Sequence, residues 1–294
     1  MTVQQPDAIR AGTRLIGLQT DSWVAAGDIS RRAAIVIHGF TADSTYMRRL
    51  ADYIQRHNYF SALFEYNSYL GIDSAAALLA EKLERIRAPL QEHGFVIVAH
   101  SMGGLVARQL ARTLRGSLGG LRGMVLLGTP NNGTVRGPNK KLVLSYMLDA
   151  AEALSIPNPF ARLPICRSAL QLTCSDDYSF IETLNAADRN DPHGVPMLSI
   201  SGGLEYLEFG AQGGNRMVNG IKNAVLQSLI KESPNDGLVP ESSSNIAAVL
   251  SSPDTHRHRN DYAEYLSTNH TYLDQNQSVA DLVVEWVQSL WPSP

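Results

Sequence analysis

The chain has 294 residues, of which 44% are hydrophobic and 18% are charged, and its formal net charge at pH 7 is −3. This composition is that of an ordinary globular protein and has no signature of intrinsic disorder. The nearly balanced charge gives no electrostatic reason to expect nucleic-acid binding, and no apolar run approaches the roughly 20 residues that span a bilayer.

The N-terminus does not resemble a signal peptide, because MTVQQPDAIRAGTRL has neither a basic start nor an apolar stretch. We therefore expect a cytoplasmic protein by default, or a secreted one if a leader has been removed. Cys166 and Cys174 are compatible both with a short disulfide loop and with two free thiols, and they lack the spacing of a zinc site. We predict no metal and no cofactor.

Strand-like and helix-like segments alternate along the chain. In order, the first are a strand at 32–40, a helix at 44–58, a strand at 59–66, a helix at 73–94, a strand at 95–99, a helix at 102–115 and a strand at 123–128. Later segments are strands at 195–201 and 245–252 and a helix at 278–290. Asp73 or Ser74 is predicted to cap the second helix. Because the strands are apolar on both faces, the sequence predicts a mostly parallel sheet with helices on both sides.

Two segments interrupt this alternation. Residues 131–194 contain a proline-punctuated helical region, and residues 203–234 contain a glycine-rich loop and a helix. We interpret both as insertions in one domain that spans residues 1–294, the first being a helical cap or lid. Within the cap, Val143 and Met147 recur at helical spacing, a pattern typical of any packed helix and also of one that lines a substrate pocket.

The stretch FVIVAHSMGGLVARQ places a serine at the end of an apolar strand and at the start of a helix. Ser101 is flanked by Ala99 and Gly103, which resembles the usual G-x-S-x-G pattern of a sharp turn that exposes a nucleophilic hydroxyl. A serine that only caps a helix does not require small residues on both sides. The pattern therefore favours a nucleophile at this position.

Two backbone groups are candidates for an oxyanion hole. The N–H group of Met102 lies at the start of the predicted helix, where unpaired donors favour negative charge. The stretch IVIHGF ends the first buried strand, and the N–H group of Phe40 is the second predicted donor. An ordinary turn at the strand end is the alternative interpretation of HGF.

A serine nucleophile needs a base, and the base needs an acid that orients it. His100 adjoins the serine and is interpreted as structural, whereas His270 lies late in the chain, in a polar loop before the last helix. Asp236, in SPNDGLVPESS, is the predicted acid, with Asp254 and Glu241 as alternatives.

Five segments together resemble the α/β-hydrolase superfamily, and more closely its bacterial lipases and esterases: HGF, AHSMGG, LLGTPNNGT, NDGLVP and NHTYL. The resemblance implies a Ser101–His270–Asp236 triad, with Phe40 and Met102 as oxyanion donors. It also implies hydrolysis of an ester or lipid substrate through an acyl-serine intermediate. The predicted cap helix follows the LGTP strand, at the carboxyl edge of the sheet, so we also expect transient contact of its apolar face with lipid surfaces.

The chain departs from this family in two places. Asn131 and Asn132 stand where many lipases carry H-x-G after LGTP, and Asp274 stands where some lipase families hold calcium, without identifiable further ligands. We predict a hydrolase of carboxylic esters. The same triad serves phospholipases, thioesterases and acyltransferases, and a non-catalytic hydrolase-like binding protein is the alternative from another class.

Overall fold

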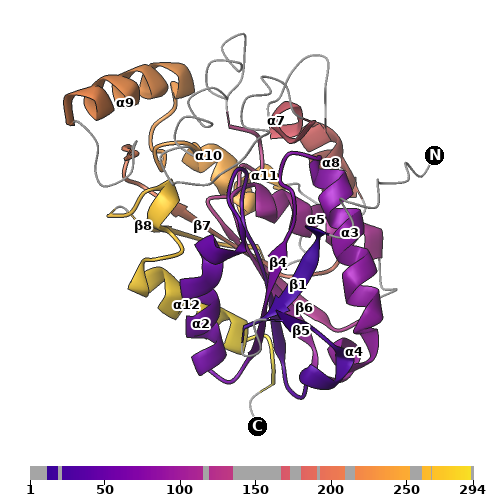
Figure 1. Cartoon of the computed structure of the whole chain (residues 1–294). Coiled ribbons are helices and arrows are strands. Elements are labelled where there is room, and N and C mark those ends of the chain that lie inside the picture. The colour runs from indigo at the N-terminus through magenta and orange to yellow at the C-terminus, as the bar shows by residue number, and fades with distance from the viewer. Residues whose placement is uncertain are drawn as a thin grey trace.

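The computed structural model of the chain describes residues 12–18, 22–114, 119–134, 167–172, 180–190, 193–208, 216–251, 260–265 and 267–292. An eight-stranded sheet runs through the molecule in the order β2-β1-β4-β3-β5-β6-β7-β8 (Figure 1). The strands are β1 Arg14–Gly17, β2 Ser22–Trp23, β3 Ala33–Ile37, β4 Phe60–Glu65, β5 Phe95–His100, β6 Leu121–Leu127, β7 Met197–Gly202 and β8 Asn260–Tyr265. Strands β3 to β8 pair in parallel, and β1 pairs antiparallel with β2 and β4. The predicted mostly parallel sheet is confirmed.

Helices cover both faces of this sheet (Figure 1). One face packs against α2 (Arg48–Arg56) and α12 (Gln277–Gln288). The other face packs against α3 (Ile72–Arg85), α4 (Arg87–His93), α5 (Met102–Leu114), α7 (Arg167–Leu172) and α8 (Phe180–Asn190). The remaining helical elements are η1 Ala26–Asp28, η2 Ser44–Met47, α9 Arg216–Ile230, α10 Glu241–Ser244, α11 Ile246–Val249 and η3 His270–Tyr272.

Strand β3 shows why the central strands are apolar throughout. Its alternate residues Ala33, Ile35 and Ile37 belong to the core beneath α3 and α5, while Ala34 and Val36 belong to the core beneath α2 and α12. Because successive side chains of a strand point to opposite faces, a strand covered on both sides must be apolar at every position.

The predicted helix at 73–94 is two helices with a break at Ile86. Pro89 explains the break, because a proline inside a helix lacks the backbone donor and its ring clashes with the carbonyl four residues earlier, here that of Arg85. A continuous, straight helix through this position is therefore strongly disfavoured.

The predicted caps of α3, Asp73 and Ser74, are wrong, since the helix already begins at Ile72. The N–H group of Gly71, which has no acceptor within the helix, donates instead to the Ser168 hydroxyl, at 2.9 Å. Ser168 belongs to α7, so this helix end is capped by a segment distant in sequence.

The predicted strand at 245–252 is also wrong. Its first residues form the short helix α11, where the Asn245 side chain accepts a hydrogen bond from the N–H group of Ala248. A short apolar run is compatible with a strand or a helix, and here the Asn245 cap favours the helix. The last strand is β8, whose sequence NDYAEY was not predicted, because an edge strand with half-exposed side chains lacks a buried apolar pattern.

The described parts of the two predicted insertions include helices: α7 and α8 lie in the first and α9 in the second. Residues 135–166 lie outside the described residues, so the cap and the single-domain division remain predictions. Among the described residues, no helix combines the length and apolarity that a bilayer span requires.

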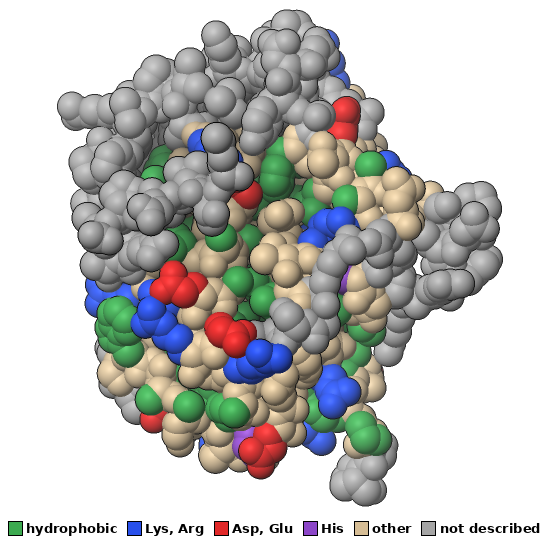
Figure 2. All heavy atoms as spheres, turned by 90° about the vertical axis from the view of Figure 1, so that its right-hand side faces the viewer, with side chains coloured by type: hydrophobic (Ala, Val, Ile, Leu, Met, Phe, Trp, Pro, Cys, Tyr) green, Lys and Arg blue, Asp and Glu red, His purple; other side chains and the backbone are tan. Residues whose placement is uncertain are grey.

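The face covered by α3 and α4 carries interspersed charges of both signs (Figure 2). Two ion pairs on these helices are Arg85 with Glu81, at 2.7 Å, and Arg87 with Glu84, at 3.1 Å. Such exposed pairs contribute little to stability, and their main effect on this face is to balance its charge.

Candidate active site

Ser101 occupies a strained turn between β5 and α5. Its φ angle is 53°, in the left-handed region that residues other than glycine seldom adopt. The turn is held by the N–H group of Ser101, which donates to the Leu127 carbonyl at 2.7 Å, and by that of Gly104, which donates to the Ser101 carbonyl at 3.0 Å. Strain of this kind persists where surrounding contacts over-determine the conformation, and it is concentrated at functional sites.

Gly103 shows why the residue two positions after the serine is small. A Cβ atom at this position would lie 2.6 Å from the His38 carbonyl oxygen and 2.9 Å from that of Ile37. The first turn of α5 therefore rests directly on the end of β3, and any side chain would push the two apart.

His270 joins Ser101 to Asp236. The His270 Nε2 atom lies 3.0 Å from Ser101 Oγ, and its Nδ1 atom lies 2.8 Å from Asp236 Oδ2. All three residues are buried. A carboxylate only accepts hydrogen bonds, so Nδ1 carries the proton and Nε2 is left to accept one from the serine hydroxyl. This is the arrangement that a general base for serine requires.

Backbone donors hold the Asp236 carboxylate in place. Its Oδ1 atom accepts from the N–H groups of Leu238, at 3.1 Å, and Val239, at 2.7 Å. The Asp236 carbonyl also accepts from the His270 N–H group, at 2.7 Å. One carboxylate oxygen is thus committed to its own turn and the other faces His270.

The structure places the two predicted oxyanion donors on segments that flank Ser101. Met102 is the first residue of α5, and Phe40 follows β3, the strand beside β5. A Cβ atom at Gly39 would lie 2.8 Å from the Ser101 Cβ atom, so the loop that carries Phe40 contacts the serine.

Glu241, the described alternative acid, does not join this group. Glu241 begins α10, and the carboxylate bonded to His270 is that of Asp236. The remaining predicted residues lie outside the described part of the chain, namely Asp254, Val143, Met147, Cys166 and Cys174.

Gly128 of the LGTP segment makes room for the His270 ring. Its φ angle is 55°, and a Cβ atom there would lie 2.9 Å from the His270 Nδ1 atom. The segment was recognised by resemblance, but its contact with the His270 ring is visible only in the folded chain.

Asn131, at the departure from H-x-G, belongs to a buried polar network. Its side chain donates to the Ser244 carbonyl at 2.9 Å and accepts from Arg108 at 3.2 Å. Arg108 also pairs with Asp188 of α8 at 2.8 Å, and burial lowers the pKa of Arg108 while the Asp188 charge opposes that shift. The network connects the loop after β6 with α5, α8 and α10.

A second buried carboxylate, that of Asp274, follows His270 by four residues in the chain. It is 2% exposed, and neither of its carboxylate oxygens has a hydrogen-bond partner in the described part of the structure. Burial raises the pKa of Asp274 to about 7, against the smaller opposing effects of nearby Tyr46 and Arg49. No group of metal-ligating side chains suited to a cation occurs among the described residues.

We expect Asp274→Asn to stabilise the protein in a pH-dependent way. The pKa of Asp274 is about 7 in the folded state and about 4 in the unfolded state. The buried carboxyl group is therefore tolerated best below pH 4, where it is protonated in both states, and the protein loses stability as the pH rises towards 7. Removing the charge should raise the free energy of unfolding by about 2–4 kcal/mol near pH 8 and change it by less than about 1 kcal/mol near pH 4.

Urea unfolding at both pH values measures this difference. Glu92→Gln is the matched control, because the Glu92 side chain is 74% exposed. If Asp274→Asn changed the free energy of unfolding equally at the two pH values, ionisation of the Asp274 carboxylate would not destabilise the folded protein.

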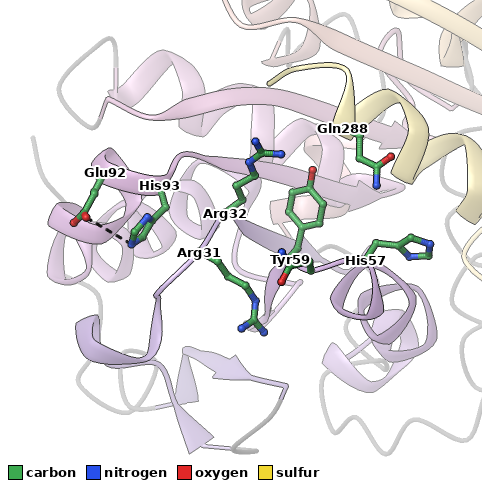
Figure 3. Close-up of a pocket in the computed structure, with 8 residues that line it drawn as sticks. Arg31, Arg32, His57, Tyr59, Glu92, His93 and Gln288 are labelled. Atoms are coloured by element: carbon green, nitrogen blue, oxygen red, sulfur yellow. Dashed lines mark ion pairs between the residues drawn. The ribbon is translucent and has the colours of Figure 1, made fainter. Parts of the chain in front are cut away.

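A polar cavity of about 460 Å³ lies away from these side chains (Figure 3). It is lined by Arg31, Arg32, His57, Asn58, Tyr59, Glu92, His93 and Gln288. These residues lie at the amino ends of β3 and β4 and at the carboxyl ends of α2, α4 and α12. Basic side chains at helix carboxyl ends offset the helix dipoles. Ser101 follows the carboxyl end of β5, so the cavity does not belong to the candidate active site.

Comparisons with known proteins agree with this fold. The sequence model of the Thioesterase domain family matches residues 37–156. No curated protein matches the chain in sequence.

Three solved structures illustrate the likeness. The mature lipase BlEst2 of Bacillus licheniformis is 14% identical, with 89% of this chain and 92% of that chain covered and a TM-score of 0.57. The RedJ thioesterase from the prodiginine biosynthetic pathway of Streptomyces coelicolor is 12% identical, with 90% and 88% covered and a TM-score of 0.54. The hydrolase olei00960 of Oleispira antarctica is 10% identical, with 90% and 98% covered and a TM-score of 0.54.

These matches support a hydrolase of esters or thioesters and do not distinguish between the two. The sheet has parallel strands β3 to β8 with an antiparallel start, and helices lie on both faces. The solved hydrolases share this architecture at low sequence identity. The chain has the α/β-hydrolase fold.

Proposed function

We propose that the protein is a serine hydrolase that cleaves carboxylic esters through an acyl-serine intermediate. The observation that carries this proposal is the continuous series of hydrogen bonds from Asp236 through His270 to Ser101, at 2.8 and 3.0 Å. The strained serine at the start of α5 supports it, because that turn presents the hydroxyl at the carboxyl edge of the sheet.

In the acylation step, His270 takes the proton from the Ser101 hydroxyl while the oxygen attacks the ester carbonyl. The carbonyl π electrons move onto oxygen, and the N–H groups of Phe40 and Met102 hold the resulting oxyanion. Collapse of this intermediate breaks the bond to the alcohol oxygen, which receives the proton from His270. Each oxyanion donor in such a site contributes about 3 kcal/mol of transition-state stabilisation.

In the deacylation step, His270 takes a proton from water, whose oxygen attacks the acyl-serine carbonyl. The second tetrahedral intermediate collapses, the carboxylic acid leaves and Ser101 recovers its proton. Asp236 stays ionised and stabilises the imidazolium in both steps. The buried, backbone-bonded position of its carboxylate suits this role.

Thioester hydrolysis is the second candidate function. The match of residues 37–156 to the Thioesterase domain family favours it, as does the structural likeness to a thioesterase. The same triad chemistry applies, with a thiol as the leaving group. Binding of the acyl chain by Val143 and Met147, and transient contact with lipid surfaces, are further proposals about residues outside the described part of the chain.

A matched pair of substrates, ethyl hexanoate and ethyl thiohexanoate, decides between these functions. For each substrate, the rate enhancement is kcat/KM divided by the rate constant of the uncatalysed hydrolysis. We expect this enhancement to be at least about tenfold higher for the ester than for the thioester. The reason is that an alkoxide leaves only when protonated, so a positioned His270 accelerates ester cleavage more than thioester cleavage.

Release of hexanoic acid measures both rates, and Ser101→Ala is the control for non-enzymatic turnover. A preference for the thioester would replace the proposal by thioesterase activity. If neither substrate reacts and a fluorophosphonate probe does not label the protein, a non-catalytic binding protein becomes the better interpretation.

A further inference from the structure

Every polar group of His270 is engaged. Asp236 holds two of them, since its carbonyl accepts from the His270 N–H group and its carboxylate faces Nδ1. The other two face adjacent residues of the serine turn. Ser101 Oγ lies beside Nε2, and the His100 Nε2 atom lies 2.8 Å from the His270 carbonyl oxygen. The turn therefore contacts both the ring and the main chain of the base.

The His100 bond has a defined direction. A carbonyl oxygen only accepts, so Nε2 of His100 carries the proton, while Nδ1 is buried and has no partner in the described part of the chain. Burial lowers the pKa of His100 to about 3, and neighbouring His270 and His38 lower it as well. The ring contacts those of Tyr46, at a centroid distance of 5.1 Å, and His270, at 4.8 Å. His100 is therefore a neutral donor throughout the pH range in which the enzyme would act.

Tyr46 makes the same kind of contact one residue later. Its hydroxyl donates to the Thr271 carbonyl at 2.8 Å, and its ring packs against His100. Two side chains thus hold two consecutive carbonyls of η3, the short helix that begins with the base. The conformation of this segment determines where the His270 ring points.

We propose that His100 is a positioning residue, which holds the main chain of His270 so that its ring stays aligned between Ser101 and Asp236. This inference rests on the proposed function. Without the His100 donor, the His270 carbonyl loses its side-chain hydrogen bond, and the segment is less firmly held. A displacement of about 1 Å at a catalytic group lowers the rate by up to about 100-fold.

His100→Ala and His100→Gln test the role of the donor. We expect His100→Ala to lower kcat by about 10- to 100-fold, with KM within about twofold of the wild-type value. His100→Gln retains an N–H donor at a similar reach and is expected to recover kcat to within about fivefold of wild type. His57→Ala is the matched control, because His57 also contacts a carbonyl, that of Tyr53 at 2.9 Å, but outside the site.

Each kcat is divided by the fraction of protein that a fluorophosphonate probe labels at completion. This normalisation separates a loss of alignment at the site from a loss of folded protein. Unchanged kcat per labelled site in His100→Ala would overturn the proposal, as would a His100→Gln variant no more active than His100→Ala. The pH profile of kcat/KM should keep its shape, and a lost or shifted limb would mean that His100 carries a proton and does not merely position the base.

Tyr46→Phe keeps the test decisive if neither His100 variant folds. It removes the donor to Thr271 and leaves the ring in place, so we expect kcat to fall about three- to tenfold. Wild-type turnover in Tyr46→Phe would then overturn the proposal. Failure of the proposed function is distinguishable, since the wild-type protein itself would neither react with the probe nor hydrolyse esters.

Discussion

Ser101→Ala is expected to lower kcat by up to about 10⁶-fold while leaving the fold intact. The substitution removes the oxygen that would attack the substrate, and neither Asp236 nor His270 can replace it. The change loses a single hydrogen bond, to His270 at 3.0 Å, so the stability cost is about 1 kcal/mol.

Single-turnover kinetics with an ester substrate and labelling by a fluorophosphonate probe measure the loss, and urea unfolding measures the stability. Ser74→Ala is the control, because Ser74 is a buried serine of α3, away from the site. A Ser101→Ala variant that kept more than about a tenth of wild-type turnover would rule out Ser101 as the nucleophile.

Asp236→Asn is expected to lower kcat by about 10⁴-fold, and the geometry gives the reason. The N–H groups of Leu238 and Val239 both donate to one oxygen of the side chain, so the oxygen of an asparagine would remain there. Its NH₂ group would then face His270 Nδ1, which would have to accept. The proton would move to Nε2, and the base could no longer accept from Ser101.

Measurement of kcat for Asp236→Asn and Glu241→Gln tests this assignment. Glu241 was an alternative acid, and its position at the start of α10 leads us to expect nearly unchanged activity for its variant. Loss of activity in Glu241→Gln together with retention in Asp236→Asn would assign the acid to Glu241. Circular dichroism of both variants excludes unfolding as the cause.

The local pattern of the chain was sufficient for the central layers of the fold. Strands β3, β5 and β6 are buried on both faces, so their apolar runs follow directly from their position in the sheet. The serine turn was also visible, because the close contact of α5 with β3 requires small residues at fixed positions around Ser101. Both patterns are contained in segments of about ten residues, which is the range over which a single sequence is informative.

Tertiary contacts decided the rest. Ile246–Val249 form a short helix, and the polar segment Asn260–Tyr265 forms the edge strand β8. A short apolar run is compatible with helix or strand, so its tertiary neighbours determine which one forms. The cap of α3 comes from α7, which the sequence around α3 cannot indicate. The same holds for the Arg108–Asn131 pair, which joins residues of separate elements.

The candidate site divides in the same way. Its residue types and order along the chain indicate serine, base and acid, but their alignment depends on contacts between Ser101, Asp236 and His270, which follow β5, β7 and β8. The bond from His100 to the His270 carbonyl links positions 170 residues apart. A sequence motif describes the chemistry that one segment offers, whereas the direction of an imidazole ring depends on every group packed around it, and only the folded chain brings those groups together.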